Sequence, residues 1–306
     1  MALSGESGGM TDVDLDAERF EKYREAGTIL RETMDEAAEL VEPGTTHLEV
    51  AEFAESAIRE AGAKPAFPAN ISVDEEASHA SPGRDDETVF AEGDLITLDL
   101  GVHVDGWIAD AAVTIDLGDH DALVAAAEDA LDAALDVAGP GVHTGEIGAA
   151  IEETIDAAGF NPIVNLSGHG LAEYDAHTEP TIPNRGVATG VELAVGDVVA
   201  IEPFATDGHG TVSEGQKTEI YSLENDRSVR NRQARQVLET VREEYDRLPF
   251  AARWFEGART EMTLNRLTQQ DVLTSYPVLK GEAGTLISQA EHTLIVTEDG
   301  VEITTA

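Results

Sequence analysis

The stretch Gly93-Asp94-Leu95-Ile96-Thr97-Leu98-Asp99 recurs later in the chain as Gly196-Asp197-Val198-Val199-Ala200-Ile201-Glu202. Both copies are apolar runs that end in a carboxylate, Asp99 in the first and Glu202 in the second. A buried charge is costly unless it is paired or binds a metal. Two equivalent acids on two inward-pointing strands therefore predict a shared cation site.

The repeat extends beyond these two strands. Pro43-Gly44 and Asn70-Ile71-Ser72 return as Pro140-Gly141 and Asn165-Leu166-Ser167, in the same order. The chain therefore consists of two related halves, each with helices followed by strands. This order predicts an α+β fold with antiparallel strand pairing.

Hydrophobic spacing, together with start and stop signals, predicts the individual elements. Thr46 and Glu49 form a capping box at the start of one helix. The expected helices span residues 14–41, 46–62, 121–137 and 144–159, and the expected strands span residues 95–103, 107–117, 198–202, 219–223 and 293–296.

The composition changes after Leu223, and the later segment has no counterpart in the first half. Residues 225–274 hold most of the later arginines, with helical spacing over 234–248 and again from Leu264. We therefore expect an inserted helical subdomain at 225–274 within a domain formed by 13–224 and 275–306. Residues 1–12 are expected to be a flexible tail, with Met10 as an alternative start.

The charge balance is extreme, since 61 acidic and 19 basic residues give a formal net charge of −42. Such a charge disfavours nucleic acid as a partner. At molar salt the screening length falls to roughly 3 Å, which would relieve the self-repulsion of this surface. We interpret the composition as adaptation to a salt-rich cytoplasm. The chain has no cysteine, no secretory signal pattern and no apolar run long enough for a membrane span.

Asp99 and Asp110 flank a predicted hairpin turn at Val104-Asp105-Gly106. A turn at 104–105 pairs residue 99 with residue 110, and a turn at 105–106 pairs residue 101 with residue 110. In both registers Asp99 and Asp110 emerge on the same face of the hairpin. Because facing carboxylates repel each other, this arrangement indicates a divalent cation between them.

The second half supplies an equivalent acid pair, Glu202 and Glu291. Four carboxylates with few other ligands suit manganese, cobalt, iron or zinc. His169, which follows the repeated Asn-Leu-Ser, is the candidate imidazole ligand, although a glycine-flanked histidine is equally compatible with a structural role.

These residues resemble the methionine aminopeptidases, from residue 14 to the end of the chain. The matching positions are His79, Asp99, Asp110, His169, His177, Ile201-Glu202-Pro203-Phe204 and Glu291-His292-Thr293. The resemblance implies the twofold-repeated "pita-bread" fold. The gap between Glu202 and Glu291 is similar to that of the type 2 subfamily, and the short start is similar to its archaeal form.

The resemblance also implies a role for each residue. Asp99 would bind one divalent ion, His169 and Glu202 the other, and Asp110 and Glu291 both. Glu202 would accept a proton from the attacking water, while His79 and His177 would contact the substrate amide and the tetrahedral intermediate. Phe67, Phe204 and Tyr276 would form an apolar pocket for methionine.

The leading hypothesis is removal of the initiator methionine from nascent proteins with a small second residue, by water activated at two divalent ions (cobalt, manganese, iron or zinc). A proline-directed peptidase of the same fold is the first alternative, but those relatives have an extra N-terminal domain and lack the insertion. The second alternative is a non-catalytic relative with a ribosome-associated role, which would be expected to lose ligands.

The expected partners are the N-termini of nascent peptides and, as a further candidate, the ribosome. Nucleic acid and membranes are not expected partners. We expect a cytoplasmic monomer.

Overall fold

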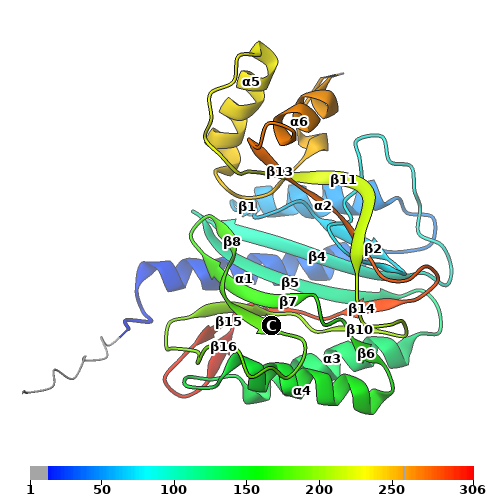
Figure 1. The fold of residues 1–306 in the computed structure, drawn as a ribbon, viewed down its shortest axis with the longest axis vertical. Coiled ribbons are helices and arrows are strands. Elements are labelled where there is room, and N and C mark those ends of the chain that lie inside the picture. Colours follow the sequence, from blue (N-terminus) through cyan, green and yellow to red (C-terminus); the bar gives the residue numbers. More distant parts are fainter. Residues whose placement is uncertain (1–12, 258) are drawn as a thin grey trace, which may run out of the picture.

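The computed structural model describes residues 13–257 and 259–306 (Figure 1). The tail expected at residues 1–12 lies outside the described residues. None of the described helices is long and apolar enough to cross a membrane.

Two pairs of helices enclose the central strands (Figure 1). Helices α1 (Glu18–Ala38) and α2 (His47–Glu60) share one apolar cluster with strand β4. Helices α3 (Asp121–Val137) and α4 (Thr144–Ala158) share a second cluster with strands of the second half. The layered body therefore has one helix pair for each half of the sequence repeat.

The local signals in the sequence explain where the helices begin. The backbone N–H of Glu49 donates to Thr46 Oγ1 at 3.1 Å, and the Glu49 carboxylate accepts from the Thr46 N–H at 2.9 Å, so the predicted capping box is confirmed. Helix α1 begins at Glu18, later than expected, because Asp14 forms a turn instead. The Asp14 carboxylate accepts the N–H of Asp16 at 3.1 Å.

Strands β4 (Leu95–Val104) and β5 (Trp107–Asp116) form the predicted hairpin. Its register pairs Gly101 with Asp110, which is the second of the two registers that the sequence allowed. Asp105 and Gly106 form the turn with φ values of 50° and 92°, a conformation that favours Asp-Gly.

The second half forms an equivalent pair from β9 (Val198–Ile201) and β15 (His292–Val296). A backbone bridge between Ala112 and Glu291 joins the two halves. Beside this bridge, the Asp110 N–H donates to Thr293 Oγ1 at 2.8 Å. The middle of β5 and the start of β15 therefore join the two halves at one place.

The strands form four small sheets, and the two pairs above belong to two of them. With β11 (Ser213–Leu223), β12 (Phe250–Ala251) and β13 (Leu273–Lys280), the strand orders are β1-β4-β2 (β5 also pairs with β4), β14-β10-β6, β12-β11-β13-β3 and β16-β15-β9-β7-β8. The remaining bounds are β1 Lys64–Pro65, β2 Asn70–Val73, β3 Glu76–Ser78, β6 Asn161–Pro162, β7 Ser167–Ala172, β8 Asp175–Pro183, β10 Phe204–Thr206, β14 Ile287–Gln289 and β16 Val301–Ile303.

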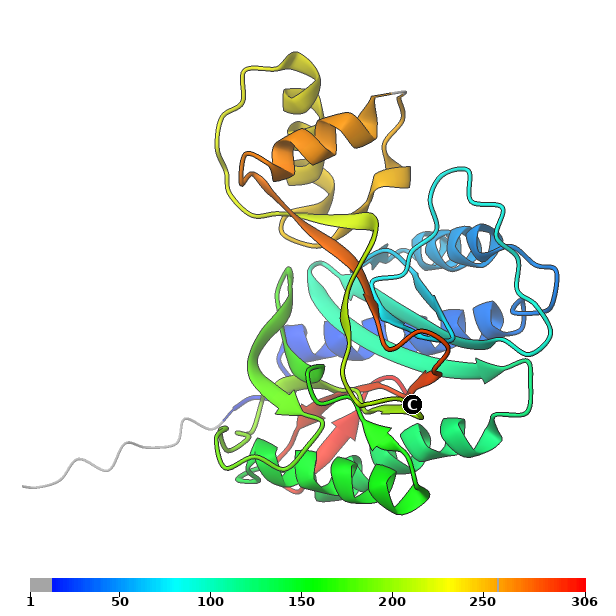
Figure 2. The same ribbon diagram turned by 45° about the vertical axis from the view of Figure 1, so that its right-hand side comes forward.

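Two long strands, β11 (Ser213–Leu223) and β13 (Leu273–Lys280), connect the layered body to residues 225–274 (Figure 2). Strand β11 starts earlier than the expected 219–223 strand because its first residues pair with the end of β13. The segment between the two strands has an apolar cluster of its own. Its elements are α5 Arg232–Thr240, η1 Val241–Tyr245, β12 Phe250–Ala251, η2 Ala252–Trp254 and α6 Thr260–Thr268.

The helix expected over 234–248 is shorter than predicted. Helix α5 ends at Thr240 and continues as a single π turn to Tyr245. The Tyr245 ring packs 5.5 Å from the Phe250 ring and 5.2 Å from the Trp254 ring, which places it in the core of the segment. The helix expected from Leu264 begins earlier, at Thr260.

Replacement of Gly27 by alanine is expected to destabilise the fold. Helix α1 lies so close to the residue that follows β16 that a Cβ at Gly27 would overlap the backbone carbonyl of Thr304. Overpacking of this kind costs about 1–3 kcal/mol. Urea unfolding at high salt would measure the loss. The matched control is Gly139→Ala, where the nearest atom is 3.8 Å from the new Cβ. Equal stability of both variants and the wild type would contradict this description of the α1 packing.

Candidate metal centre and substrate pocket

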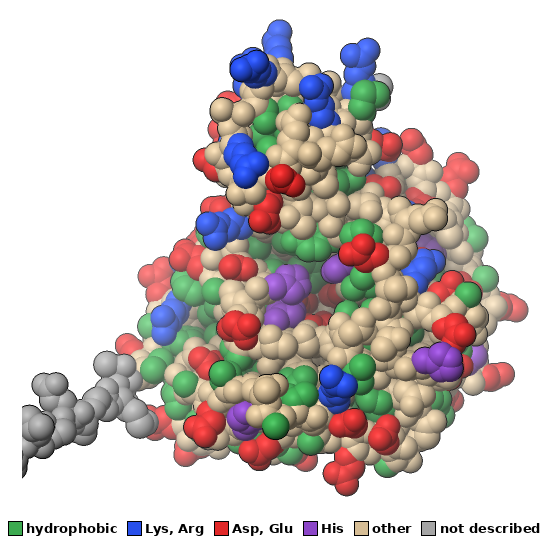
Figure 3. All heavy atoms as spheres, in the orientation of Figure 1, with side chains coloured by type: hydrophobic (Ala, Val, Ile, Leu, Met, Phe, Trp, Pro, Cys, Tyr) green, Lys and Arg blue, Asp and Glu red, His purple; other side chains and the backbone are tan. Residues whose placement is uncertain are grey.

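One cavity of about 220 Å³ is lined by all five candidate ligands. Asp99 lies in β4, Asp110 in β5 and His169 in β7, while Glu202 directly follows β9 and Glu291 directly precedes β15. The hollow is visible in the centre of Figure 3, with acidic side chains inside and histidine side chains at its rim. The fold therefore brings together residues that span 193 positions from Asp99 to Glu291 counted inclusively.

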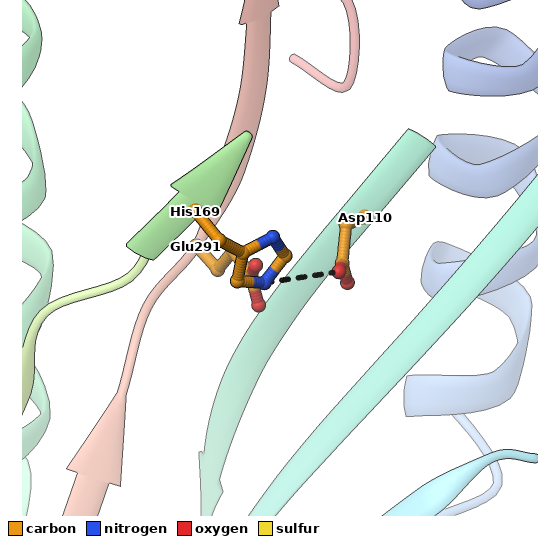
Figure 4. Close-up of side chains that lie close together, drawn as sticks. All are labelled: Asp110, His169 and Glu291. Atoms are coloured by element: carbon orange, nitrogen blue, oxygen red, sulfur yellow. Dashed lines mark ion pairs between the residues drawn. The ribbon is translucent and has the colours of Figure 1, made fainter. Parts of the chain in front are cut away.

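The potential ligand atoms are close to one another. One ligand atom from each of Asp110, His169 and Glu291 lies within 4.8 Å of the others (Figure 4). His169 Nε2 is 3.9 Å from Asp110 Oδ2 and 3.5 Å from Glu202 Oε1. The other ring nitrogen, Nδ1, is 3.3 Å from the carbonyl of Gly170, so Nδ1 carries the proton and Nε2 is free to act as a ligand.

The oxygen atoms that face this space fit a divalent cation. Among the described residues, none donates a hydrogen bond to the buried atoms Asp99 Oδ1, Asp110 Oδ1 and Glu291 Oε1. Unpaired buried acceptors are rare in proteins, and a cation satisfies several of them at once. Carboxylates with one imidazole suit manganese, cobalt, iron or zinc.

The carboxyl groups also show the electrostatic cost of this arrangement. Burial raises the pKa of Asp99 to about 7. Burial, followed by the charge of Asp99, raises the pKa of Asp110 and of Glu202 well above their ordinary values. Burial and the three other acids raise the pKa of Glu291 in the same way. A bound divalent cation would reverse these effects.

Two amide side chains contact the candidate ligands and were not identified from the sequence. Gln289 Nε2 donates to Glu291 Oε2 at 3.1 Å and to Glu202 Oε2 at 3.3 Å. Asn70 Nδ2 donates to Asp99 Oδ2 at 3.3 Å. The sequence signal for Gln289 was its position two residues before Glu291, because residues two apart on an extended chain point to the same side.

The remaining predicted site residues also line the cavity. Phe67 and Phe204 are buried, and the ring of Tyr276 lies 5.4 Å from that of His79. The rings of His169 and His177 are 4.4 Å apart, and His177 is exposed at the mouth of the cavity. The structure therefore places an apolar wall beside the carboxylates.

His79 has an unusual backbone conformation, with φ at 60°. Its Nδ1 lies 3.3 Å from the carbonyl of Pro277. Because a carbonyl can only accept, Nδ1 carries the proton, and Nε2 is an acceptor in the neutral ring. Burial lowers the pKa of His79 to about 4, so the ring is neutral near pH 7.

Two histidines near candidate ligands in the sequence have other contacts. His103 Nδ1 accepts the N–H of Gly106 at 3.0 Å and so supports the hairpin turn. His292 Nδ1 is 2.8 Å from Thr305 Oγ1. Neither residue lines the cavity.

The fold and site match a known family of metal-dependent peptidases. Residues 21–298 match metallopeptidase family M24, and the chain therefore belongs to this family. It is 53% identical to the methionine aminopeptidase of Archaeoglobus fulgidus, over 95% of this chain and all of the relative.

Solved structures agree at the level of the fold. The methionine aminopeptidase of Thermotoga maritima superposes with a TM-score of 0.71 at 26% identity, over 97% of this chain and 99% of that protein. The prolidase of Pyrococcus furiosus has a TM-score of 0.62 at 20% identity, over 94% of this chain but only 64% of that protein. The predicted α+β pita-bread fold and the predicted metallopeptidase class are therefore confirmed.

Binding of a divalent ion is expected to stabilise the chelator-treated protein. Manganese or cobalt would neutralise buried carboxylates that otherwise repel, and a ligand at 100 times its Kd adds about 2.7 kcal/mol to the free energy of unfolding. Thermal unfolding with and without metal, at constant ionic strength, would measure the shift.

The variants Asp110→Asn and Glu291→Gln are expected to lose most of this shift, because each removes an anionic ligand. An unfolding midpoint of the wild type that does not respond to any of manganese, cobalt, iron or zinc would contradict the metal centre.

Proposed function

We propose that this chain removes the N-terminal methionine from proteins whose second residue is small. The observation that carries the proposal is the cavity in which unpaired carboxylate oxygens and an imidazole lie beside an apolar wall. The relationship to methionine aminopeptidases, which covers nearly the whole chain, supports the choice of methionine.

We assign two divalent ions to this cavity. Asp99 would hold one, His169 and Glu202 the other, and Asp110 and Glu291 would bridge them. When bound, such ions make water nucleophilic at neutral pH and polarise the peptide carbonyl. The assignment gives each half of the repeat one terminal and one bridging acid.

The residues of the chain would orient the substrate and move its protons. His79 Nε2, the acceptor nitrogen of a neutral ring, is suited to receive the N–H of the scissile amide. Glu202 would accept a proton from the attacking water and pass it on as the peptide bond breaks. His177 at the cavity mouth would stabilise the tetrahedral intermediate.

Phe67, Phe204 and Tyr276 would enclose the unbranched methionine side chain. The free amine of the substrate would face the acids, and this would restrict cleavage to N-termini. A proline-directed activity is disfavoured by sequence identity, which is 53% to the Archaeoglobus methionine aminopeptidase and 20% to the prolidase. A non-catalytic role is disfavoured because all five candidate ligands are present and lie together.

We further infer a type 2 subfamily member from a salt-rich cytoplasm. The helical segment at 225–274 supports the subfamily, with 13–224 and 275–306 as the catalytic domain. The net charge of −42 supports the salt-rich setting. We retain the expectation of a monomer.

Peptide specificity tests the proposal directly. Protein supplied with metal at high salt is expected to release methionine from Met-Ala-Ser and to leave Met-Lys and Gly-Pro peptides largely uncut. This outcome is expected if the space beside the candidate ligands admits only a small second residue. Chromatographic measurement of free methionine would give the rates.

Glu202→Gln serves as the control for a contaminating peptidase, since it keeps the side-chain shape but removes the proton acceptor. We expect its kcat to fall by about 100-fold or more. Preferential cleavage of Xaa-Pro peptides by the wild type would refute the proposed specificity.

We also propose the ribosome as a partner, docked through the arginine-bearing end of residues 225–274. This segment has nine of the 19 basic residues of the chain. Eight of these nine arginines are exposed, and among the described residues only Arg242 and Arg253 of the nine form ion pairs. Arg230 and Arg266 line one hollow between α5 and α6, and basic side chains gather at this end in Figure 3.

The segment has eight acidic residues beside its nine arginines and is therefore close to neutral, and its exposed arginines suit direct contact with phosphate. Guanidinium groups bind phosphate through paired hydrogen bonds, which persist where salt screens longer-range attraction. The net charge of the whole chain disfavours nucleic acid as a partner. The concentration of arginines at this end of the molecule is what permits this one contact.

Co-sedimentation with ribosomes from a halophilic archaeon, in molar KCl, would test the contact. Replacement of Arg230, Arg232, Arg235 and Arg266 by glutamine is expected to lower the sedimented fraction several-fold, because direct phosphate contacts are lost. The control replaces Arg19, Arg31 and Arg185 by glutamine outside the segment. Equal sedimentation of both variants and the wild type would refute the docking surface.

A further inference from the structure

A buried ion pair joins the 225–274 segment to the layered body. Arg253 in η2 and Glu55 in α2 contact each other through Nη2 and Oε1, and each side chain is only 4% exposed. Trp254 Nε1 donates to the other carboxylate oxygen of Glu55 at 2.6 Å. Buried ion pairs rarely improve stability over apolar packing, so this one is better explained by what it holds in place.

The second arm of the Arg253 guanidinium reaches a different segment. Arg253 Nη1 donates to Ser81 Oγ at 2.8 Å and to the carbonyl of Pro82 at 3.1 Å. Ser81 Oγ in turn donates to the carbonyl of Ala69 at 2.8 Å. The N–H of Ala69 donates back to Glu55 Oε1 at 3.3 Å, which closes a ring of three side chains and the Ala69 backbone.

Both segments in this ring carry residues of the substrate cavity. Ala69 lies between Phe67, a wall residue, and Asn70, which donates to Asp99. Ser81 lies two residues after His79, and the Ile71 N–H donates to the Ala80 carbonyl at 2.6 Å to hold the segments side by side. The ring is therefore built behind the wall that faces the substrate.

The His79 backbone needs such support. A side chain at φ 60° is strained, and strained residues persist only where their surroundings hold them firmly. A lysine at 253 could not replace the arginine, because only the planar guanidinium can donate to Glu55 and Ser81 at once.

We propose that Arg253 is a positioning residue: through Glu55 and Ser81 it fixes the two wall segments that carry Phe67, Asn70 and His79. The inserted segment thereby sets the shape of the substrate pocket. This inference rests on the proposed aminopeptidase function for its kinetic test, and on geometry alone for its spectroscopic test.

Two variants separate positioning from stability. Ser81→Ala removes the hydrogen bond to the Ala69 carbonyl without leaving a buried charge unpaired. Arg253→Lys keeps the positive charge but loses the two-armed guanidinium that contacts both Glu55 and Ser81. For both we expect kcat/KM for Met-Ala-Ser to fall by about 10- to 100-fold, since small misplacements of a binding group have effects of this size. Affinity for manganese should change less than kcat/KM, because the two segments hold none of the five candidate ligands and contact Asp99 through the Asn70 side chain.

The matched control is Arg24→Lys. Arg24 also forms a forked pair, with Glu302 at 2.7 and 2.9 Å, but it joins α1 to β16 away from the cavity. We expect wild-type kcat and KM for this variant. A purely structural role for Arg253 would lower the unfolding midpoint of its variants and leave kcat and KM of the folded protein unchanged, and that result would overturn the proposal.

Histidine-selective NMR gives a test that does not depend on activity. The ring signals of His79 are expected to shift in Ser81→Ala and in Arg253→Lys, and to stay unchanged in Arg24→Lys. If the wild type releases no methionine, the proposed function fails while this measurement still decides the positioning role. Unchanged His79 signals in both test variants would refute it.

Discussion

Four carboxyl groups are buried together in the cavity, and the rest of the structure must hold them there although their negative charges repel one another. Burial of such charges costs several kcal/mol per ion. The two halves of the repeat share this task. The Ala112–Glu291 backbone bridge and the hydrogen bond from Asp110 N–H to Thr293 Oγ1 fasten the halves where the acids meet. The helices on the outside then pack against strands whose positions are already fixed by this junction.

Much of the site could be predicted because it depends on short-range geometry. Side chains alternate between the two faces of a strand, and this placed Asp99 and Asp110 on one face of the hairpin in either turn register. The sequence repeat then indicated Glu202 and Glu291 as the equivalent pair in the second half. The exact register required the structure, since the choice of turn residues differs by only one position. The helix at 121–137 was predicted with its observed bounds, because its apolar spacing is regular.

Other features depend on residues far apart in the chain and left no local signal. Glu55 and Arg253 are 198 positions apart, and neither has a neighbour in sequence that indicates an ion pair. The π turn before Tyr245 arises because its ring packs into the core of the inserted segment, a tertiary effect that overrides helical spacing. The ion pair is a long-range contact that lies behind the wall of the pocket, whereas the ligands in the pocket follow patterns that the sequence shows.

The acids of this chain fall into two groups that obey different physics. Those on the surface repel one another through water, so dissolved salt screens them over a few ångströms. Those in the cavity are shielded from salt by the surrounding protein, and burial itself raises the pKa of Asp110, Glu202 and Glu291. A monovalent salt bath therefore cannot relieve the inner group. Protons or directly bound cations can do so, and a divalent cation relieves the repulsion while the carboxylates stay ionised. A salt-adapted surface therefore does not remove the need for a specific metal centre.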